Sequence, residues 1–238
     1  MYIDMVCKHR DLLGKGLLQA GLSALSGMRP KALARLNQLA VKIESEQWIE
    51  PAALCCIRST SWWTSCSSIA VSSSVSLEKN STQESASDIA VAFVTLGSKY
   101  DAAIARFSAQ GENLDAYLLS EISLGALGKL TRRVEAFVRR SAYHVGLHAG
   151  SPIFPGESQL GLDVQEQMLA LAKAERIGMT LTKSGMLVPV KSLSMLIGIG
   201  SNMLRRSQKA ACEQCASAKK CRQDCRRRQH IDQSTPLA

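Results

Sequence analysis

The chain has 238 residues, of which 46% are hydrophobic, 21% charged and 5% aromatic. This length can bury a substantial core, and the composition excludes collagen-like, coiled-coil and globally disordered chains. No apolar run reaches the roughly 18 residues of a membrane-spanning helix, and the first residues are too charged for a signal peptide. We therefore expect a soluble, cytoplasmic protein.

The net charge of +9 is concentrated towards the C-terminus. The segment from 205 to 228 contains nine Lys and Arg residues and only two acidic residues, Glu213 and Asp224, so it carries a charge of +7. The rest of the chain is close to neutral. A solvated charged tail and a nucleic-acid contact both remain open for such a segment.

Periodicity and helix breakers predict the elements of the first half. Leucines at helical spacing, with Gly27 as a stop and Pro30 as a first helical residue, predict two helices within 11–46. Residues 52–58 can form a strand. The serine-rich segment 59–87 is predicted to be a loop or irregular strands, because serine side chains compete for backbone hydrogen bonds.

The middle of the chain is more regular. Residues 89–96 form a continuous apolar run rich in β-formers, which predicts a buried strand. Helical patterns follow at 98–110 and 114–143. A long segment rich in Gly and Pro, 144–162, is predicted to be a functional loop.

The last apolar region predicts one more helix and two strands. Asp163 can cap a helix over 164–176 that Gly178 ends, and two short apolar segments lie within 179–200. Because helices and strands do not alternate regularly, the predicted fold class is α+β. The expected segments are an N-terminal helical region (1–58), a serine-rich insertion (59–87), a core (88–205) and a basic, cysteine-rich tail (206–238).

The glycine-rich loop and the segment after it could hold a ligand. Glycine removes the side chain and lets a ligand approach backbone N–H groups. Hydroxyls that could donate to a ribose or a carboxylate belong to Ser151, Thr182, Ser184, Ser192 and Ser194. The alternative is an ordinary Gly-Pro turn beside serines on the exposed face of a strand.

Residues 177–194 read IGMTLTKSGMLVPVKSLS. This pattern resembles the signature of the activation domain of vitamin B12-dependent methionine synthase, and Pro155-Gly156 stands where that family has a Pro-Gly loop. The matching signature residues are Ile177, Gly178, Met179, Leu181, Thr182, Ser184, Pro189, Ser192 and Ser194. The resemblance covers about residues 20–205.

The resemblance implies a helical, C-shaped α+β domain around an antiparallel sheet that binds S-adenosylmethionine. In the family, cobalamin that has oxidised to an inert state is reduced by one electron and remethylated by S-adenosylmethionine. The corrinoid would sit on a partner protein or methyltransferase, because this chain has no D-x-H-x-x-G cobalamin-binding motif. Any catalytic residue is unknown from the sequence. The cofactor-binding residues implied are Pro155, Gly156, Glu157, Thr182, Ser184, Pro189 and Ser192.

Three positions depart from the family pattern. Pro152 and Glu157 stand where the family has Arg and Tyr, and Lys183 replaces an acidic residue. An arginine would hold the carboxylate of the methyl donor through paired hydrogen bonds, which proline cannot do. His148 or Lys183 could take over that role. An alternative function is therefore a non-catalytic docking or electron-relay module for a corrinoid protein.

Four cysteines in the tail, Cys212, Cys215, Cys221 and Cys225, are close enough in sequence to share a metal. Thiolates suit an iron–sulfur cluster or Zn²⁺, and the compact spacing favours a [4Fe–4S] cluster, which could relay an electron from an acidic redox partner. The alternative is a zinc knuckle that binds nucleic acid through the basic tail. The few aromatic residues near the tail argue against base stacking.

Overall fold

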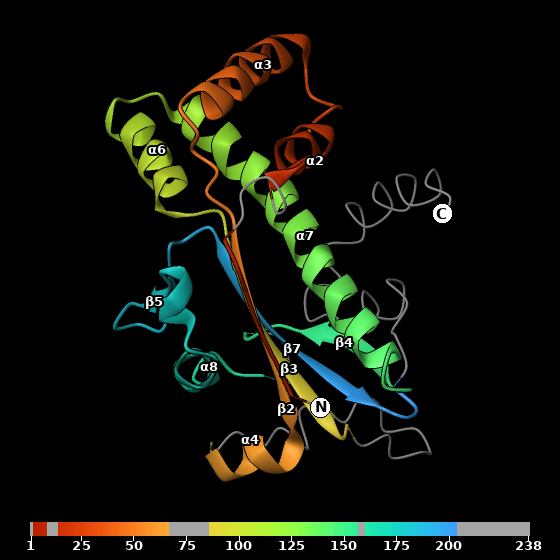
Figure 1. Ribbon diagram of the computed structural model, residues 1–238. Helices are drawn as coiled ribbons and strands as arrows, with labels where there is room; N and C mark the ends of the chain where they lie inside the picture. The colour runs from red at the N-terminus through yellow and green to blue at the C-terminus, as the bar shows by residue number, and fades with distance from the viewer. Residues whose placement is uncertain (1, 9–13, 67–85, 157–159, 204–238) are drawn as a thin grey trace, which may run out of the picture.

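A five-stranded antiparallel sheet forms the centre of the protein (Figure 1). The computed structural model describes residues 2–8, 14–66, 86–156 and 160–203. The strand order across the sheet is β1 (Ile3–Cys7), β2 (Ala52–Ser59), β3 (Asp88–Thr95), β7 (Ser192–Gly200) and β4 (His148–Ile153).

Both faces of the sheet are covered, which explains the long apolar runs of its central strands. Every residue of β3 is buried, as are all residues of β2 except the last. Alternate side chains enter two separate cores, so that Leu54 and Phe93 face one core while Cys55 and Ala92 face the other. A strand buried on both faces needs apolar residues at every position rather than at every second one.

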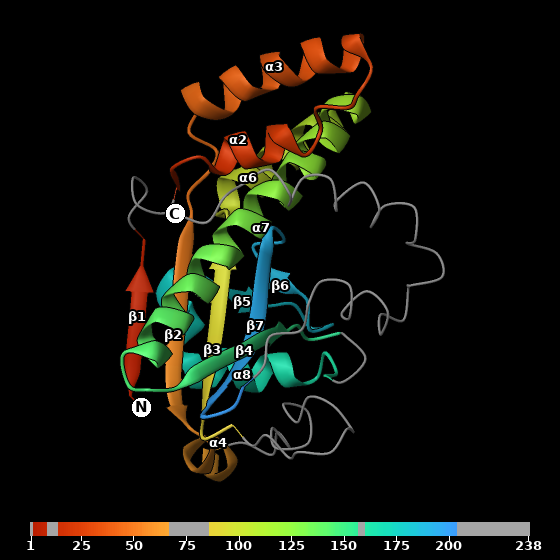
Figure 2. The same ribbon diagram turned by 90° about the vertical axis from the view of Figure 1, so that its right-hand side faces the viewer.

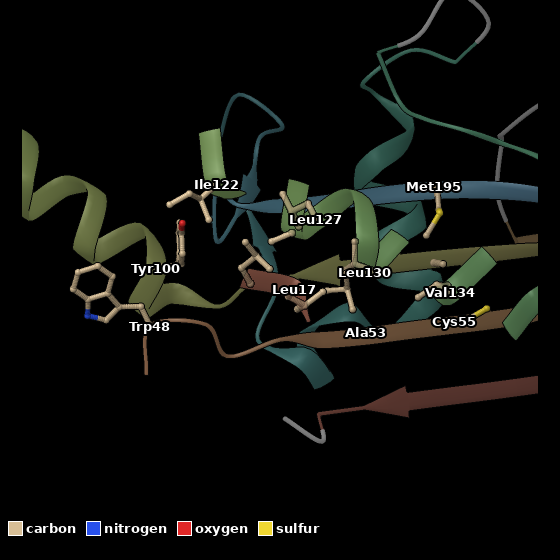
Figure 3. Packing of buried hydrophobic residues seen from close by; sticks show 14 of the residues in the cluster. Leu17, Trp48, Ala53, Cys55, Tyr100, Ile122, Leu127, Leu130, Val134 and Met195 are labelled. Carbon is tan, nitrogen blue, oxygen red and sulfur yellow. The ribbon is translucent and has the colours of Figure 1, made fainter. Parts of the chain in front are cut away.

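Helix α7 (Asn113–Tyr143) covers the first face, and α2 (Leu17–Ser23), α3 (Pro30–Ser45) and α6 (Ser98–Ala109) pack against α7 towards one end of the sheet (Figure 1). The longest, α7, has 31 residues and runs along the sheet as a diagonal (Figure 2). Its apolar stripe includes Leu130 and Val134, which lie over Ala53 and Cys55 of β2 (Figure 3). Arg35 joins α3 to α7 through two hydrogen bonds to the buried carboxylate of Asp115, at 2.7 and 2.5 Å.

The helices α2 and α7 cross at glycines. A Cβ atom added to Gly21 would lie 2.7 Å from Ile122 Cγ2 and closer still to the carbonyl oxygen of Ile122, and one added to Gly125 would lie 2.7 Å from the carbonyl oxygen of Ala20. These distances are shorter than a van der Waals contact. The two backbones therefore approach as closely as they do only because neither residue has a side chain.

Smaller elements cover the second face: α4 (Thr60–Cys66), α8 (Val164–Ala172), the 3₁₀ helix η1 (Ala174–Ile177), and a hairpin of β5 (Thr180–Leu181) and β6 (Leu187–Val188). Trp63, Met168 and Met179 are almost fully buried in the core beneath them. Among the described residues no helix combines the length and hydropathy that crossing a bilayer requires.

The predicted fold class is confirmed as α+β with an antiparallel sheet, and the main helices and strands lie close to their predicted positions. These are the strands predicted over 52–58 and 89–96 and the helices predicted over 98–110 and 114–143. The segment boundaries remain predictions, although the sheet draws strands from both 1–58 and 88–205.

Three local predictions were wrong, and one strand was not predicted. The strand β1 was missed because its five residues, IDMVC, are too few for a periodic signal and are interrupted by the charged Asp4. Residues 60–66 are helical rather than a loop or irregular strands, since Trp63 supplies an apolar anchor; residues 67–85 lie outside the described part of the chain. The segment expected to be a loop contains β4, which accepts Pro152 because it is an edge strand. Asp163 is at the N-cap position of α8 but makes no capping hydrogen bond through its side chain. The predicted helix is divided into α8, which ends at Ala172, and η1, which Gly178 ends as predicted.

Candidate functional site

The signature segment begins where the chain leaves η1. Gly178 has a φ of 74°, a left-handed conformation that favours glycine, and it turns the chain so that Met179 enters the core. The hairpin of β5 and β6 follows, and Pro189 leads into β7. Ser184 and Gly185, which lie between the two short apolar segments predicted within 179–200, are in the turn of this hairpin.

The hairpin turn carries two exposed hydroxyls. Thr182 Oγ1 accepts a hydrogen bond from the backbone N–H of Met186 at 3.1 Å and lies 2.9 Å from Ser184 Oγ. Both side chains are exposed, as is that of Lys183 between them. Because their side chains are exposed, the two hydroxyls are accessible to a ligand, and each can form further hydrogen bonds.

The two signature serines of β7 have partners inside the protein. Ser192 Oγ donates to Thr95 Oγ1 of β3 at 2.8 Å, and Ser194 Oγ donates to Gln165 Oε1 of α8 at 3.0 Å. Both serines are buried. Their described contacts link elements of the fold, so a ligand would meet them only through the surfaces that they support.

The residues just before β7 are held by α6 and α7. Asp101, in the first turn of α6, accepts hydrogen bonds from the backbone N–H groups of Val190 at 2.5 Å and Lys191 at 3.2 Å. Lys191 Nζ donates to Ser120 Oγ of α7 at 2.7 Å. The residues directly after Pro189 are therefore held by two helices.

The Pro-Gly loop follows β4. Pro155 is half-buried, and Gly156 is exposed with a φ of 90°, which no other residue type adopts readily. The backbone N–H of Gly156 donates to the carbonyl of Leu160 at 2.7 Å, and Leu160 is buried in the core under α8. Glu157, the third residue predicted for this loop, lies outside the described residues.

The two suggested replacements for the family arginine are placed differently. Pro152 itself pairs with Ile197 within the sheet. His148 pairs with Gly200 at the other end of β4, about 16 Å along the strand from Ile153, so it is poorly placed to act in this loop. Lys183 is on the hairpin turn.

Sequence reasoning missed Gln165, which connects the Pro-Gly loop with the signature segment 177–194. Gln165 accepts the hydrogen bond from Ser194 and donates through Nε2 to the carbonyl of Gly185 in the hairpin turn at 3.0 Å. Its backbone N–H donates to the carbonyl of Leu162, and Leu162 packs where a side chain at Gly156 would lie. The structure thus connects the Pro-Gly loop, the hairpin turn and β7 through the start of α8.

Thr95 and Asp101 were also missed. Their partners in the signature segment are distant in the sequence: Ser192 is 97 residues from Thr95, and the partners of Asp101 are at least 89 residues away. The pattern of apolar and polar residues along the sequence did not indicate a functional role for either residue.

Two hollows lie elsewhere on the first face. A cavity of about 640 Å³ is formed by α2, α3 and the residues before α2, and its lining includes Lys15, Leu18, Leu22, Ile43 and Glu44. A shallower one of about 290 Å³ lies between Trp48 and Arg106. No residue of the signature or of the Pro-Gly loop lines either hollow.

The described residues include no group of three or more His, Cys, Asp or Glu side chains that could hold a metal ion. The predicted metal ligands Cys212, Cys215, Cys221 and Cys225 lie outside the described residues.

Comparison with known proteins gives a match at the level of structure. No protein-family model matches the chain, and no curated protein matches it. A solved structure does match, the crystal structure of the MetH reactivation domain bound to AdoHcy, with a TM-score of 0.54 and 12% sequence identity over 83% of this chain and 78% of that one. The likeness confirms the resemblance at the level of the fold: the chain has the activation-domain-like fold of the MetH reactivation domain.

Proposed function

We propose that this protein binds S-adenosylmethionine and supports the reductive remethylation of cobalamin carried by a separate corrinoid-dependent methyltransferase, such as methionine synthase. The observation that carries the proposal is the likeness, over 83% of the chain, to a reactivation domain whose crystal structure contains AdoHcy, the demethylated form of this donor. The signature at 177–194 supports it independently.

The residues around the hairpin turn and the Pro-Gly loop are suited to such a ligand. The exposed backbone at Gly156, next to the half-buried Pro155, can approach an adenosine or an amino-acid group closely. Thr182 and Ser184 offer exposed hydroxyls to a ribose or a carboxylate. Pro189 and Ser192 are buried and would form the wall behind the ligand.

The chemistry belongs largely to the partner's cofactor. When the partner docks, its cobalt, after taking one electron from an external reductant, would accept the methyl group of S-adenosylmethionine, with cleavage of the sulfur–methyl bond and release of S-adenosylhomocysteine. The residues of this chain bind the donor, present its methyl group at the surface and limit access of water to it. A cytoplasmic location suits this role, and the expectation of an acidic redox partner depends on the tail.

Isothermal titration of the purified protein with S-adenosylmethionine tests the proposal. We expect saturable one-to-one binding, competition by S-adenosylhomocysteine, and weaker binding of methionine or adenosine alone, each of which carries half of the recognised groups. Absence of any heat or competition with S-adenosylmethionine would overturn the proposed function.

A second candidate, a docking or electron-relay module without donor binding, is favoured by Pro152 and Glu157. The double substitution Pro152→Arg and Glu157→Tyr separates the two. A protein that binds the donor only after this change supports the second candidate. A wild-type protein that already binds it supports the first.

A further inference from the structure

Gln165 is a buried polar residue in the first turn of α8, with only 4% of its surface exposed. Both ends of its side-chain amide are used. The carbonyl of Gly185 can only accept, so the amide nitrogen must face it, and this fixes the amide oxygen towards Ser194. A buried amide with both ends paired holds its neighbours at defined positions, because a change at either partner leaves a polar group unsatisfied.

The partners of Gln165 belong to two different regions of the signature. Gly185 is in the turn that carries Thr182 and Ser184, and its φ of 79° requires glycine. Ser194 lies in β7, two residues after Ser192 and five after Pro189. The hairpin has only two pairs of facing strand residues, and its turn is largely exposed. These few pairs hold the orientation of the hairpin only weakly.

We propose that Gln165 is the positioning residue of the donor site: it sets the distance between the hairpin turn and β7, and thereby places Thr182 and Ser184 over the surface that the donor occupies. This inference depends on the proposed function. Gln165 acts through the groups that it holds and is not itself in contact with the donor. The preceding loop shares this anchor, since Leu162 both packs against Gly156 and accepts the backbone hydrogen bond of Gln165.

The test is the affinity for S-adenosylmethionine of Gln165→Leu, which removes both hydrogen bonds and keeps a similar volume. We expect the affinity to fall about tenfold or more. The matched control is Met168→Ala, one turn further along α8: Met168 is fully buried in the core beneath α8, so its truncation lowers stability, and it makes neither of the hydrogen bonds of Gln165. Melting temperatures are measured in parallel, and the control is expected to keep wild-type affinity.

Gln165→Glu adds a readout that a purely structural role would not give. An ionised carboxylate repels the Gly185 carbonyl, whereas a protonated one donates to it and still accepts from Ser194. The affinity of this variant, relative to wild type, should therefore recover as the pH falls from about 8 to about 5, towards the range where a glutamate protonates.

The outcomes are distinguishable. A wild-type protein that binds S-adenosylmethionine while Gln165→Leu binds it equally well overturns the inference and leaves the proposed function intact. Equal losses of affinity in Gln165→Leu and Met168→Ala also overturn it, because they indicate a general effect of stability. A wild-type protein that does not bind overturns the proposed function, and with it this inference.

Discussion

Two buried threonines differ in how their hydroxyls are satisfied. Thr95 Oγ1 accepts hydrogen bonds from Ser192 Oγ at 2.8 Å and from the backbone N–H of Gly97 at 3.1 Å. The hydroxyl of Thr131, on α7, is buried without a hydrogen-bond partner among the described residues. The first hydroxyl connects β3 to the signature, whereas the second carries a desolvation cost with no compensating bond.

The same substitution should therefore have opposite effects at these two sites. Thr95→Val is expected to lower the free energy of unfolding by about 1–3 kcal/mol, because it leaves buried donors unpaired. Thr131→Val should leave it unchanged or raise it by up to about 1 kcal/mol, because it removes an unpaired hydroxyl. Urea denaturation measures both. A larger loss at Thr131 than at Thr95 would contradict this account of the two sites.

The adjacent cysteines of β2 make stability depend on alkaline pH. Burial raises the pKa of the Cys55 thiol, and burial likewise raises that of Cys56 above the ordinary value of 9.0. Above about pH 9 the unfolded chain loses these protons while the folded chain keeps them, so the free energy of unfolding falls as the pH rises. Below that pH both states are protonated and the contribution is fully present.

Denaturation midpoints compared at about pH 8 and about pH 10.5 measure this effect. Cys55→Ala should reduce the alkaline loss of stability, although a fraction of it will persist because burial also raises the pKa of Tyr100. An alkaline loss of the same size in wild type and in Cys55→Ala would show that the thiol is not responsible.

At the scale of elements, the crossing of α2 and α7 depends on glycine at one position and not at its neighbour. A Cβ at Gly125 would lie 2.7 Å from both the Ala20 carbonyl oxygen and the Gly21 Cα. A Cβ at Gly128, one turn away on the same helix, would meet only the flexible end of Arg132 at 3.6 Å. The first position is sterically closed and the second is open.

Gly125→Ala should therefore lower the free energy of unfolding by about 1–3 kcal/mol, because it forces the two helices apart. Gly128→Ala should raise it by about 0.5–1 kcal/mol, because alanine loses less backbone entropy in a helix. Thermal denaturation of the two variants compares them directly. Equal changes of the same sign would contradict the close approach of the two helices at Gly125.

The elements that the sequence predicted are those with a strong periodic signal. The helix at 114–143 has an apolar pattern with the period of an α-helix, and the strands at 52–58 and 89–96 are apolar runs too short for a typical helix. The edge strands β1 and β4 were missed, because β1 has only five residues with Asp4 among them and β4 contains Gly150 and Pro152. Their pairing is decided by neighbours far away in the chain.

The residues of the candidate site also differ in whether the sequence could predict them. Pro155, Gly156 and the signature residues were found from a family pattern, which is local in sequence. The residues that hold them, Gln165, Thr95 and Asp101, were not found, because their contacts span 20 to 97 residues. Sequence reasoning also treated Ser192 and Ser194 as exposed donors, whereas both are buried and paired.

At the scale of the whole molecule, the cysteine cluster of the tail stays a prediction with a direct test. Protein purified without oxygen should contain about four iron and four sulfide per chain if Cys212, Cys215, Cys221 and Cys225 hold a [4Fe–4S] cluster. Replacement of Cys212 and Cys215 by alanine should abolish it, and Cys55→Ala should not, since Cys55 is buried in the sheet. One zinc without sulfide would exclude the electron relay and favour the zinc-knuckle alternative.

The central claim is that the donor site lies where the Pro-Gly loop, the hairpin turn and the start of β7 meet, rather than in the cavity of about 640 Å³ beside α2 and α3. Hydrogen exchange followed by mass spectrometry, with and without S-adenosylmethionine, locates the site on the intact chain. We expect protection of peptides that cover 150–156 and 177–195, and none in peptides that cover α2 and α3. Protection confined to α2 and α3 would contradict the claim, as would unchanged exchange throughout the chain.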